Sequence, residues 1–125
     1  MMPVIDGATA PVFDIPGVRF TGLASPQRGS HENCVWRVSV GPGIEPRFHQ
    51  LTREEIFVAL AGMAQFHIGG TMHTLTAGSA AVVPPGTDFA IANSAEIPFE
   101  ALVVLPVGGQ AVLPGEAPFT PPWAV

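Results

Sequence analysis

The sequence contains no tyrosine, no lysine and only one cysteine, Cys34. Without tyrosine there is no phenol to serve as a catalytic acid, so acid and base chemistry must come from other side chains. A single cysteine excludes an internal disulfide, and Cys34 has no basic neighbour in the sequence that would activate its thiol. We therefore expect an inert, buried thiol in a cytoplasmic protein.

Charge is also scarce. The formal net charge is −5, and the only basic residues apart from histidine are five arginines spread along the chain. Scattered arginines on an acidic chain form no phosphate-binding stripe, so we expect no nucleic-acid partner. No apolar run approaches the roughly 20 residues of a membrane-spanning helix, so we expect no membrane partner either.

Apolar surface, by contrast, is abundant. Hydrophobic residues make up 47% of the 125 residues and charged residues only 12%, about half of the usual charged share of roughly 25%. A chain of this length fits one domain. A domain this small has a limited interior and cannot bury so many apolar side chains by itself. We expect the surplus to be buried between two copies of the chain in a homodimer.

Glycine and proline punctuate the chain, with 14 of each. The runs between them are short and rich in β-forming residues, and none has the sustained spacing of an amphipathic helix. This pattern is typical of an all-β sandwich or barrel. The predicted strands are Val18–Leu23, Cys34–Val40, Arg47–Gln50, Ile56–Ala61, Ala64–Ile68, Thr71–Leu75, Ala80–Val83, Asp88–Ala92 and Phe99–Leu105.

The single domain is predicted to have three parts. Residues 1–33 form an N-terminal strand and a polar loop that lead into the barrel, and residues 34–107 form the barrel core. Residues 108–125 form a tail in which proline and glycine alternate with apolar residues. We expect this tail to be extended and to pack, through its aromatic residues, on the barrel or on a partner subunit.

His49 and Glu55 carry the chemistry that the sequence predicts. Residues of equal parity share a face of a strand, so His49 points the same way as Leu51, and Glu55 the same way as Phe57. If these faces line one interior, an imidazole and a carboxylate meet inside an apolar barrel. They then form either a structural hydrogen-bonded pair or a catalytic pair in which Glu55 orients His49 as general base.

The block around these two residues resembles the first motif of the cupin superfamily, written G(X)5HXH(X)3,4E(X)6G. Gly43, His49, Glu55 and Gly62 stand at the spacing of this motif, and Leu51 occupies the place of its second histidine.

A second block resembles the second cupin motif, written G(X)5PXG(X)2H(X)3N. Gly78, Pro84, Gly86 and Asn93 fit it, and Phe89 occupies the place of its histidine. Two motifs in register are far more specific than either alone. The resemblance implies an all-β fold, the cupin double-stranded β-helix, which is a jelly-roll-like barrel.

The resemblance also implies a divalent metal held by three histidines and one glutamate. Only His49 and Glu55 remain as candidate metal ligands, because Leu51 and Phe89 cannot coordinate a metal. Transition-metal sites normally use at least three protein ligands. We therefore predict no firm cofactor and keep a divalent transition metal as an alternative, with His31 of the polar loop as the one histidine that could join the pair.

Three functions stay open at this point. The first is a small-molecule-binding cupin of undetermined reaction without a full metal site. Arg47 then points inward near the barrel rim, where it pairs with Glu45 or Glu55 or, less favoured, with a substrate carboxylate. The second is a metal-dependent cupin oxygenase or isomerase with a reduced ligand set. The third is a non-catalytic structural or regulatory module with a filled barrel. Around the His49 and Glu55 pair, the predicted pocket residues are Trp36, Arg47, Leu51, Phe57 and Phe89.

Overall fold

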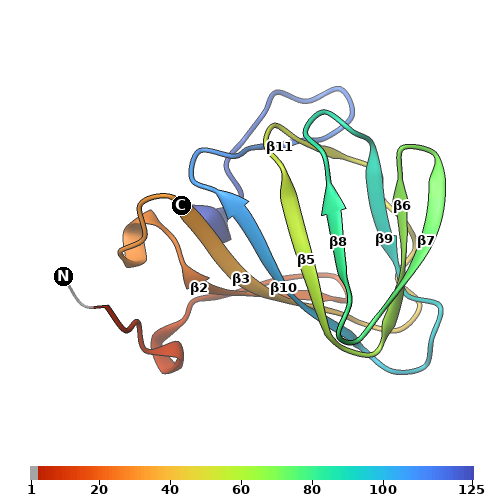
Figure 1. Ribbon diagram of the computed structural model, residues 1–125, viewed down its shortest axis with the longest axis horizontal. Helices are drawn as coiled ribbons and strands as arrows, with labels where there is room; N and C mark the ends of the chain where they lie inside the picture. Colours follow the sequence, from red (N-terminus) through yellow and green to blue (C-terminus); the bar gives the residue numbers. More distant parts are fainter. Residues whose placement is uncertain (1–2) are drawn as a thin grey trace.

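The structure, a computed structural model, describes residues 3–125, and most of its regular structure is β-strand (Figure 1). In this range the helical segments are three short 3-10 turns, η1 (Gly7–Thr9), η2 (Pro26–Arg28) and η3 (Pro122–Ala124). The strands are β1 (Val12–Ile15), β2 (Val18–Ala24), β3 (Asn33–Val40), β4 (Gln50–Leu51), β5 (Glu55–Ala61), β6 (Met63–Ile68), β7 (Thr71–Thr76), β8 (Ala80–Val83), β9 (Phe89–Ala92), β10 (Phe99–Pro106) and β11 (Ala111–Val112).

The strands form two antiparallel layers that enclose the core (Figure 1). The first layer is a six-stranded sheet in the order β1-β2-β3-β10-β5-β8. The second consists of β7-β6-β9 and β11-β4, which are linked by an isolated bridge between His49 and Phe89. Strands far apart in sequence thus lie side by side, as in a jelly roll. The predicted all-β, jelly-roll-like barrel is confirmed.

One predicted strand is wrong and two were missed. The segment predicted at Arg47–Gln50 is a loop as far as Phe48, His49 forms only the isolated bridge with Phe89, and the regular strand begins at Gln50. Pro42 and Pro46 provide no backbone donor in the preceding stretch, which limits sheet pairing there. The missed strands, β1 and β11, are short and lie among prolines, so their composition resembles that of loops.

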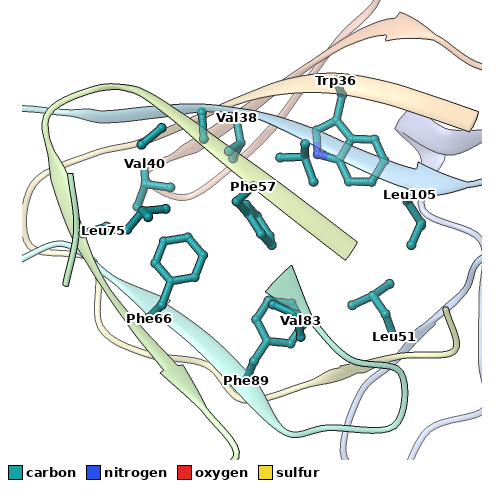
Figure 2. Close-up of a cluster of buried hydrophobic side chains, with 14 of the residues drawn as sticks. Trp36, Val38, Val40, Leu51, Phe57, Phe66, Leu75, Val83, Phe89 and Leu105 are labelled. Atoms are coloured by element: carbon teal, nitrogen blue, oxygen red, sulfur yellow. The ribbon is translucent and has the colours of Figure 1, made fainter. Parts of the chain in front are cut away.

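Alternating burial builds the core. In β3 and β10 every second side chain is buried, as the period of a half-buried strand requires. Phe66 is fully buried, and its ring meets those of Phe57 and Phe99 edge-on, at centroid distances of 5.0 and 5.8 Å. Figure 2 shows Phe57, Phe66 and Phe89 in the middle of this cluster, with Leu51 at one end. The aromatic cluster fixes how the two layers face each other.

Two motif residues have structural tasks that explain their presence. Gly62, between β5 and β6, has φ +73°, and a Cβ there would clash with the Pro98 carbonyl oxygen. Asn93 is buried, and its amide donates to the carbonyl oxygens of Val40 and Ile97 at 3.0 Å each. Both residues therefore hold turns of the barrel, and the motif encodes the fold here independently of any metal.

The C-terminal tail folds back on its own barrel (Figure 1). Ala111 forms a bridge with Phe119, and the Trp123 ring stacks on Phe20 with a centroid distance of 3.6 Å and an interplanar angle of 2°. The Cys34 thiol is buried and donates to the Ala124 carbonyl oxygen at 3.4 Å. The tail thus closes one side of the molecule. Within residues 3–125, no helical segment has the length and apolar character needed to span a bilayer.

Candidate active site

A cavity of about 520 Å³ lies between the two layers, so the barrel interior is not filled. One wall comes from β2, β3 and β5, and the opposite wall from β9 and the loop that precedes β4. The N-terminal turn at Ile15 and Pro16 and the C-terminal tail complete the lining. The cavity is bounded by Ile15, Pro16, Val18, Phe20, Trp36, Val38, Val40, Ile44, Glu45, Arg47, Phe48, His49, Leu51, Glu55, Phe57, Phe89, Ile91, Ala111, Leu113, Phe119, Pro121, Pro122 and Trp123.

Almost all of these side chains are apolar. The ionisable ones are Glu45, Arg47, His49 and Glu55. Glu45 and Arg47 are exposed, while His49 is partly buried and Glu55 is buried. The cavity therefore has a polar rim and an apolar interior that contains one carboxyl group and one imidazole.

Glu55 is the first residue of β5, where backbone pairing with Val83 fixes its position. The residue is 4% exposed, and no group among residues 3–125 forms a hydrogen bond with its carboxyl group. Burial raises the pKa of Glu55 to about 8, because the charged form would lose its water without gaining a partner. At neutral pH the group is thus a protonated carboxyl, which can donate a hydrogen bond to a ligand.

His49 is held by the backbone at the edge of the same cavity. Its N–H and carbonyl oxygen pair with the carbonyl oxygen and N–H of Phe89, each at 3.0 Å. Nδ1 lies 3.2 Å from the Arg47 carbonyl oxygen. A carbonyl oxygen only accepts, so Nδ1 carries the hydrogen, and Nε2 of the neutral ring keeps its lone pair. Burial lowers the pKa of His49, and the contact with the Arg47 carbonyl opposes this only in part.

The structure brings His49 and Glu55 to one cavity, but it does not form the predicted hydrogen-bonded pair. No hydrogen bond between the two side chains occurs in the described chain. Each group instead lines the cavity separately, His49 as a neutral base and Glu55 as a protonated acid. Groups whose environments shift their pKa values apart are typical of acid and base pairs in enzymes.

The predicted pocket residues all line the cavity, in two different environments. Trp36, Leu51, Phe57 and Phe89 are buried wall residues. Arg47 is exposed at the rim, and its predicted ion pair with Glu45 or Glu55 is wrong. The ion pairs found among residues 3–125 join Arg19 to Asp14 and Arg37 to Glu100. Arg47 follows Pro46 in an irregular loop, so strand parity does not direct its side chain.

The metal set that the resemblance implies does not fit this cavity. Leu51 and Phe89 take the two histidine places, and the Phe89 ring centroid lies 4.2 Å from that of His49. The described residues contain no cluster of three or more histidine, cysteine, aspartate or glutamate side chains that could hold a metal. His31 and His73 are exposed, away from this cavity wall. His49 and Glu55 are left as two donors, fewer than such sites use.

The tail supplies cavity residues that the sequence analysis missed. Trp123 lines the cavity while stacked on Phe20, and its centroid lies 6.3 Å from that of Trp36. The aromatic residues at the end of the tail were the feature of the sequence that indicated such packing. Where they pack could not be predicted, because the contacts join residues about 100 positions apart.

The sequence profile of the family described as Cupin domain matches residues 35–105. No curated protein gives a significant match. The polyketide cyclase RemF from Streptomyces resistomycificus superposes with a TM-score of 0.75 at 16% identity, over 94% of this chain and 88% of its own.

Two further solved structures are similar. An RmlC-like cupin from Shewanella frigidimarina NCIMB 400 has a TM-score of 0.71 at 19% identity, over 85% of this chain and 91% of its own. The DMSP lyase DddQ from Ruegeria pomeroyi DSS-3 has a TM-score of 0.63 at 30% identity, over 70% of this chain but only 47% of its own. The named activities differ, so these likenesses describe the fold and not a reaction.

Proposed function

This chain belongs to the cupin family, whose profile covers more than half of it, and on that premise we propose that it binds a largely apolar small molecule in the barrel cavity. The volume of about 520 Å³ lies within the roughly 300–1,000 Å³ of typical ligand sites. We also propose a cytoplasmic location, since the single cysteine, Cys34, is buried and forms no disulfide within the described residues.

The observation that carries this proposal is the partnerless carboxyl group of Glu55 in an otherwise apolar wall. The residue is 4% exposed, and its carboxyl group lines the cavity with no hydrogen-bond partner among the described residues. It can therefore form a hydrogen bond with a bound molecule, which is worth about 0.5–1.5 kcal/mol. A ligand that presents an acceptor atom to the protonated carboxyl forms this hydrogen bond. The surrounding aromatic and aliphatic side chains then bury the rest of the ligand.

Tryptophan emission gives a direct test, because both tryptophans of the chain, Trp36 and Trp123, line the cavity. We expect the neutral probe N-phenyl-1-naphthylamine to quench this emission saturably, with one probe bound per chain. The substitution Val38→Phe puts a ring into the cavity and should raise the Kd at least ~10-fold, about 1.4 kcal/mol.

The matched control is Val12→Phe, the same change at an exposed position outside the cavity lining. It should leave the Kd unchanged. Quenching by wild-type protein that rises linearly without saturating would contradict the proposal, as would equal Kd values for the two variants.

We also propose that two copies associate through the outer face of β5 and β8. Val58, Leu60 and Val82 are 37%, 40% and 51% exposed there. Because the alternate residues Phe57 and Ala59 point into the core, these side chains project outward. A solvent-facing sheet surface is normally polar. An exposed apolar patch of this kind suits contact with the same patch of a second copy related by a two-fold axis.

Introducing charge into this face should separate the copies. For the double variant Val58→Glu with Val82→Glu, we expect light scattering at micromolar concentration to give the monomer mass of 13.0 kDa. The wild type and the control Met72→Glu, which changes an exposed side chain of β7, should both give about twice this mass. A wild-type mass near 13.0 kDa would refute the dimer.

A further inference from the structure

We propose that the cavity catalyses proton transfer at the carbon beside the carbonyl group of an apolar ketone or aldehyde, with His49 as base and Glu55 as acid. The inference rests on the proposed binding function and names a substrate class and a reaction for the same site.

The base is prepared by the backbone. Because Nδ1–H of His49 is engaged by the Arg47 carbonyl oxygen at 3.2 Å, the free lone pair is on Nε2. The antiparallel pairing of His49 with Phe89 prevents the backbone from turning the ring away. A neutral, oriented imidazole in an apolar wall is a competent general base for a C–H proton.

The acid is prepared by burial. The carboxyl group of Glu55 has no partner among the described residues, and it lines the cavity that His49 also lines. As a protonated carboxyl it donates a hydrogen bond to a carbonyl oxygen and stabilises the charge that develops there during enolisation. The other charged groups that line the cavity are Glu45 and Arg47, both exposed at the rim.

The step balances without any further reactant. Nε2 of His49 takes the proton from the α-carbon, and the C–H electron pair becomes the carbon–carbon double bond of the enol. The carbonyl π electrons move to oxygen, which takes the proton of Glu55. The enol then faces an imidazolium and a carboxylate. In the reverse step the enol O–H returns its proton to Glu55, and the imidazolium protonates the same carbon. If the imidazolium has meanwhile exchanged its proton with solvent, the α-hydrogen is exchanged. Protonating a conjugated carbon instead shifts a double bond.

The lining favours a flat apolar substrate over a sugar. Apart from the two proton-transfer groups, the inner wall offers no side chain that could bind several hydroxyl groups. Trp36, Phe57 and Phe89 instead provide aromatic surfaces. Burying unpaired hydroxyl groups against these rings would be unfavourable, whereas an aryl ketone presents one acceptor and an apolar body.

The test follows hydrogen exchange of 2-tetralone in D₂O by NMR. With wild-type protein we expect α-hydrogen exchange at least ~100-fold faster than in buffer alone. His49→Gln and Glu55→Gln should each lower the protein-dependent rate at least ~100-fold. Binding of 2-tetralone, measured by tryptophan quenching, should change by less than about threefold, because the affinity resides mainly in the apolar wall.

The matched controls are His73→Gln and Glu54→Gln, which make the same changes at exposed positions outside the cavity, and both should exchange at the wild-type rate. N-phenyl-1-naphthylamine should inhibit wild-type exchange competitively, which tests the site without any substitution. Saturable binding of 2-tetralone with exchange no faster than in buffer would overturn this inference and leave the binding function standing. A failure of both ligands to quench would overturn the binding function itself.

Discussion

Glu55→Gln is expected to remove a loss of stability that the wild-type protein suffers as the pH rises from 5 to 9. The pKa of Glu55 is about 8 in the folded protein, against its usual value of 4.5 in an unfolded chain. A raised pKa of this size corresponds to a free-energy change on the order of 4 kcal/mol over that range. That is a large fraction of the 5–15 kcal/mol typical of a small domain.

The sign follows from which state binds more protons. Below pH 4.5 both states hold the Glu55 proton, and the contribution to stability is fully present. As the pH rises, the unfolded chain releases the proton first, so the free energy of unfolding falls. The loss is complete once the pH has passed about 8. His49, whose folded pKa is lowered, acts in the opposite direction and loses stability as the pH falls below 6.5.

Urea unfolding at pH 5, 7 and 9 measures this effect, and the difference between variant and wild type isolates Glu55 because both proteins keep His49. We expect the free energy of unfolding of Glu55→Gln, relative to that of wild type, to be highest at pH 9 and lowest at pH 5. The control Glu54→Gln removes the same charge from the exposed neighbouring residue and should follow the wild-type curve. If the free energy of unfolding changed with pH in the same way for all three proteins, Glu55 would have its ordinary pKa. Its charged form would then be stabilised by a partner that the structure does not show.

The fold could be predicted from the sequence because its signals are local. The turn at Gly62 needs a residue that tolerates positive φ, and Asn93 holds its turn through the carbonyl oxygens of Val40 and Ile97. Such turns occur at fixed spacings, and the spacings survive even though two metal-ligand places carry apolar residues. The motif therefore identified the barrel while saying little about the chemistry inside it.

The site could be predicted only in part. Strand parity placed Leu51 and Phe57 on the cavity wall because it depends on backbone geometry alone. Arg47, which lies in a loop, also lines the cavity at its rim, but the ion pair predicted for it does not form. The open cavity and the lack of a partner for Glu55 depend on packing between distant segments, including the stacking of Trp123 on Phe20. No local pattern in the sequence reports such contacts.

Restoring the two missing histidines should convert the cavity into a metal site. His49, Leu51, Glu55 and Phe89 line one cavity, and the rings of His49 and Phe89 are already 4.2 Å apart between centroids. Phe89→His with Leu51→His would therefore supply four donors where two exist now, which matches the number that tetrahedral zinc uses. Without metal, the double variant should be less stable than wild type by a few kcal/mol, because Phe89 is fully buried against Phe57.

Zinc should then restore what the substitutions remove. At a zinc concentration ~1,000-fold above the Kd, binding to the folded state adds about 4 kcal/mol to stability. Thermal unfolding with and without zinc measures this gain, and equilibrium dialysis counts the bound ions. A graded series gives the control: little gain for wild type with two donors, an intermediate gain for Phe89→His with three, and the largest for the double variant. Stoichiometric zinc on the wild type, lost in His49→Gln, would show that two protein donors suffice here, and the metal-free assignment of His49 and Glu55 as base and acid would fall with it.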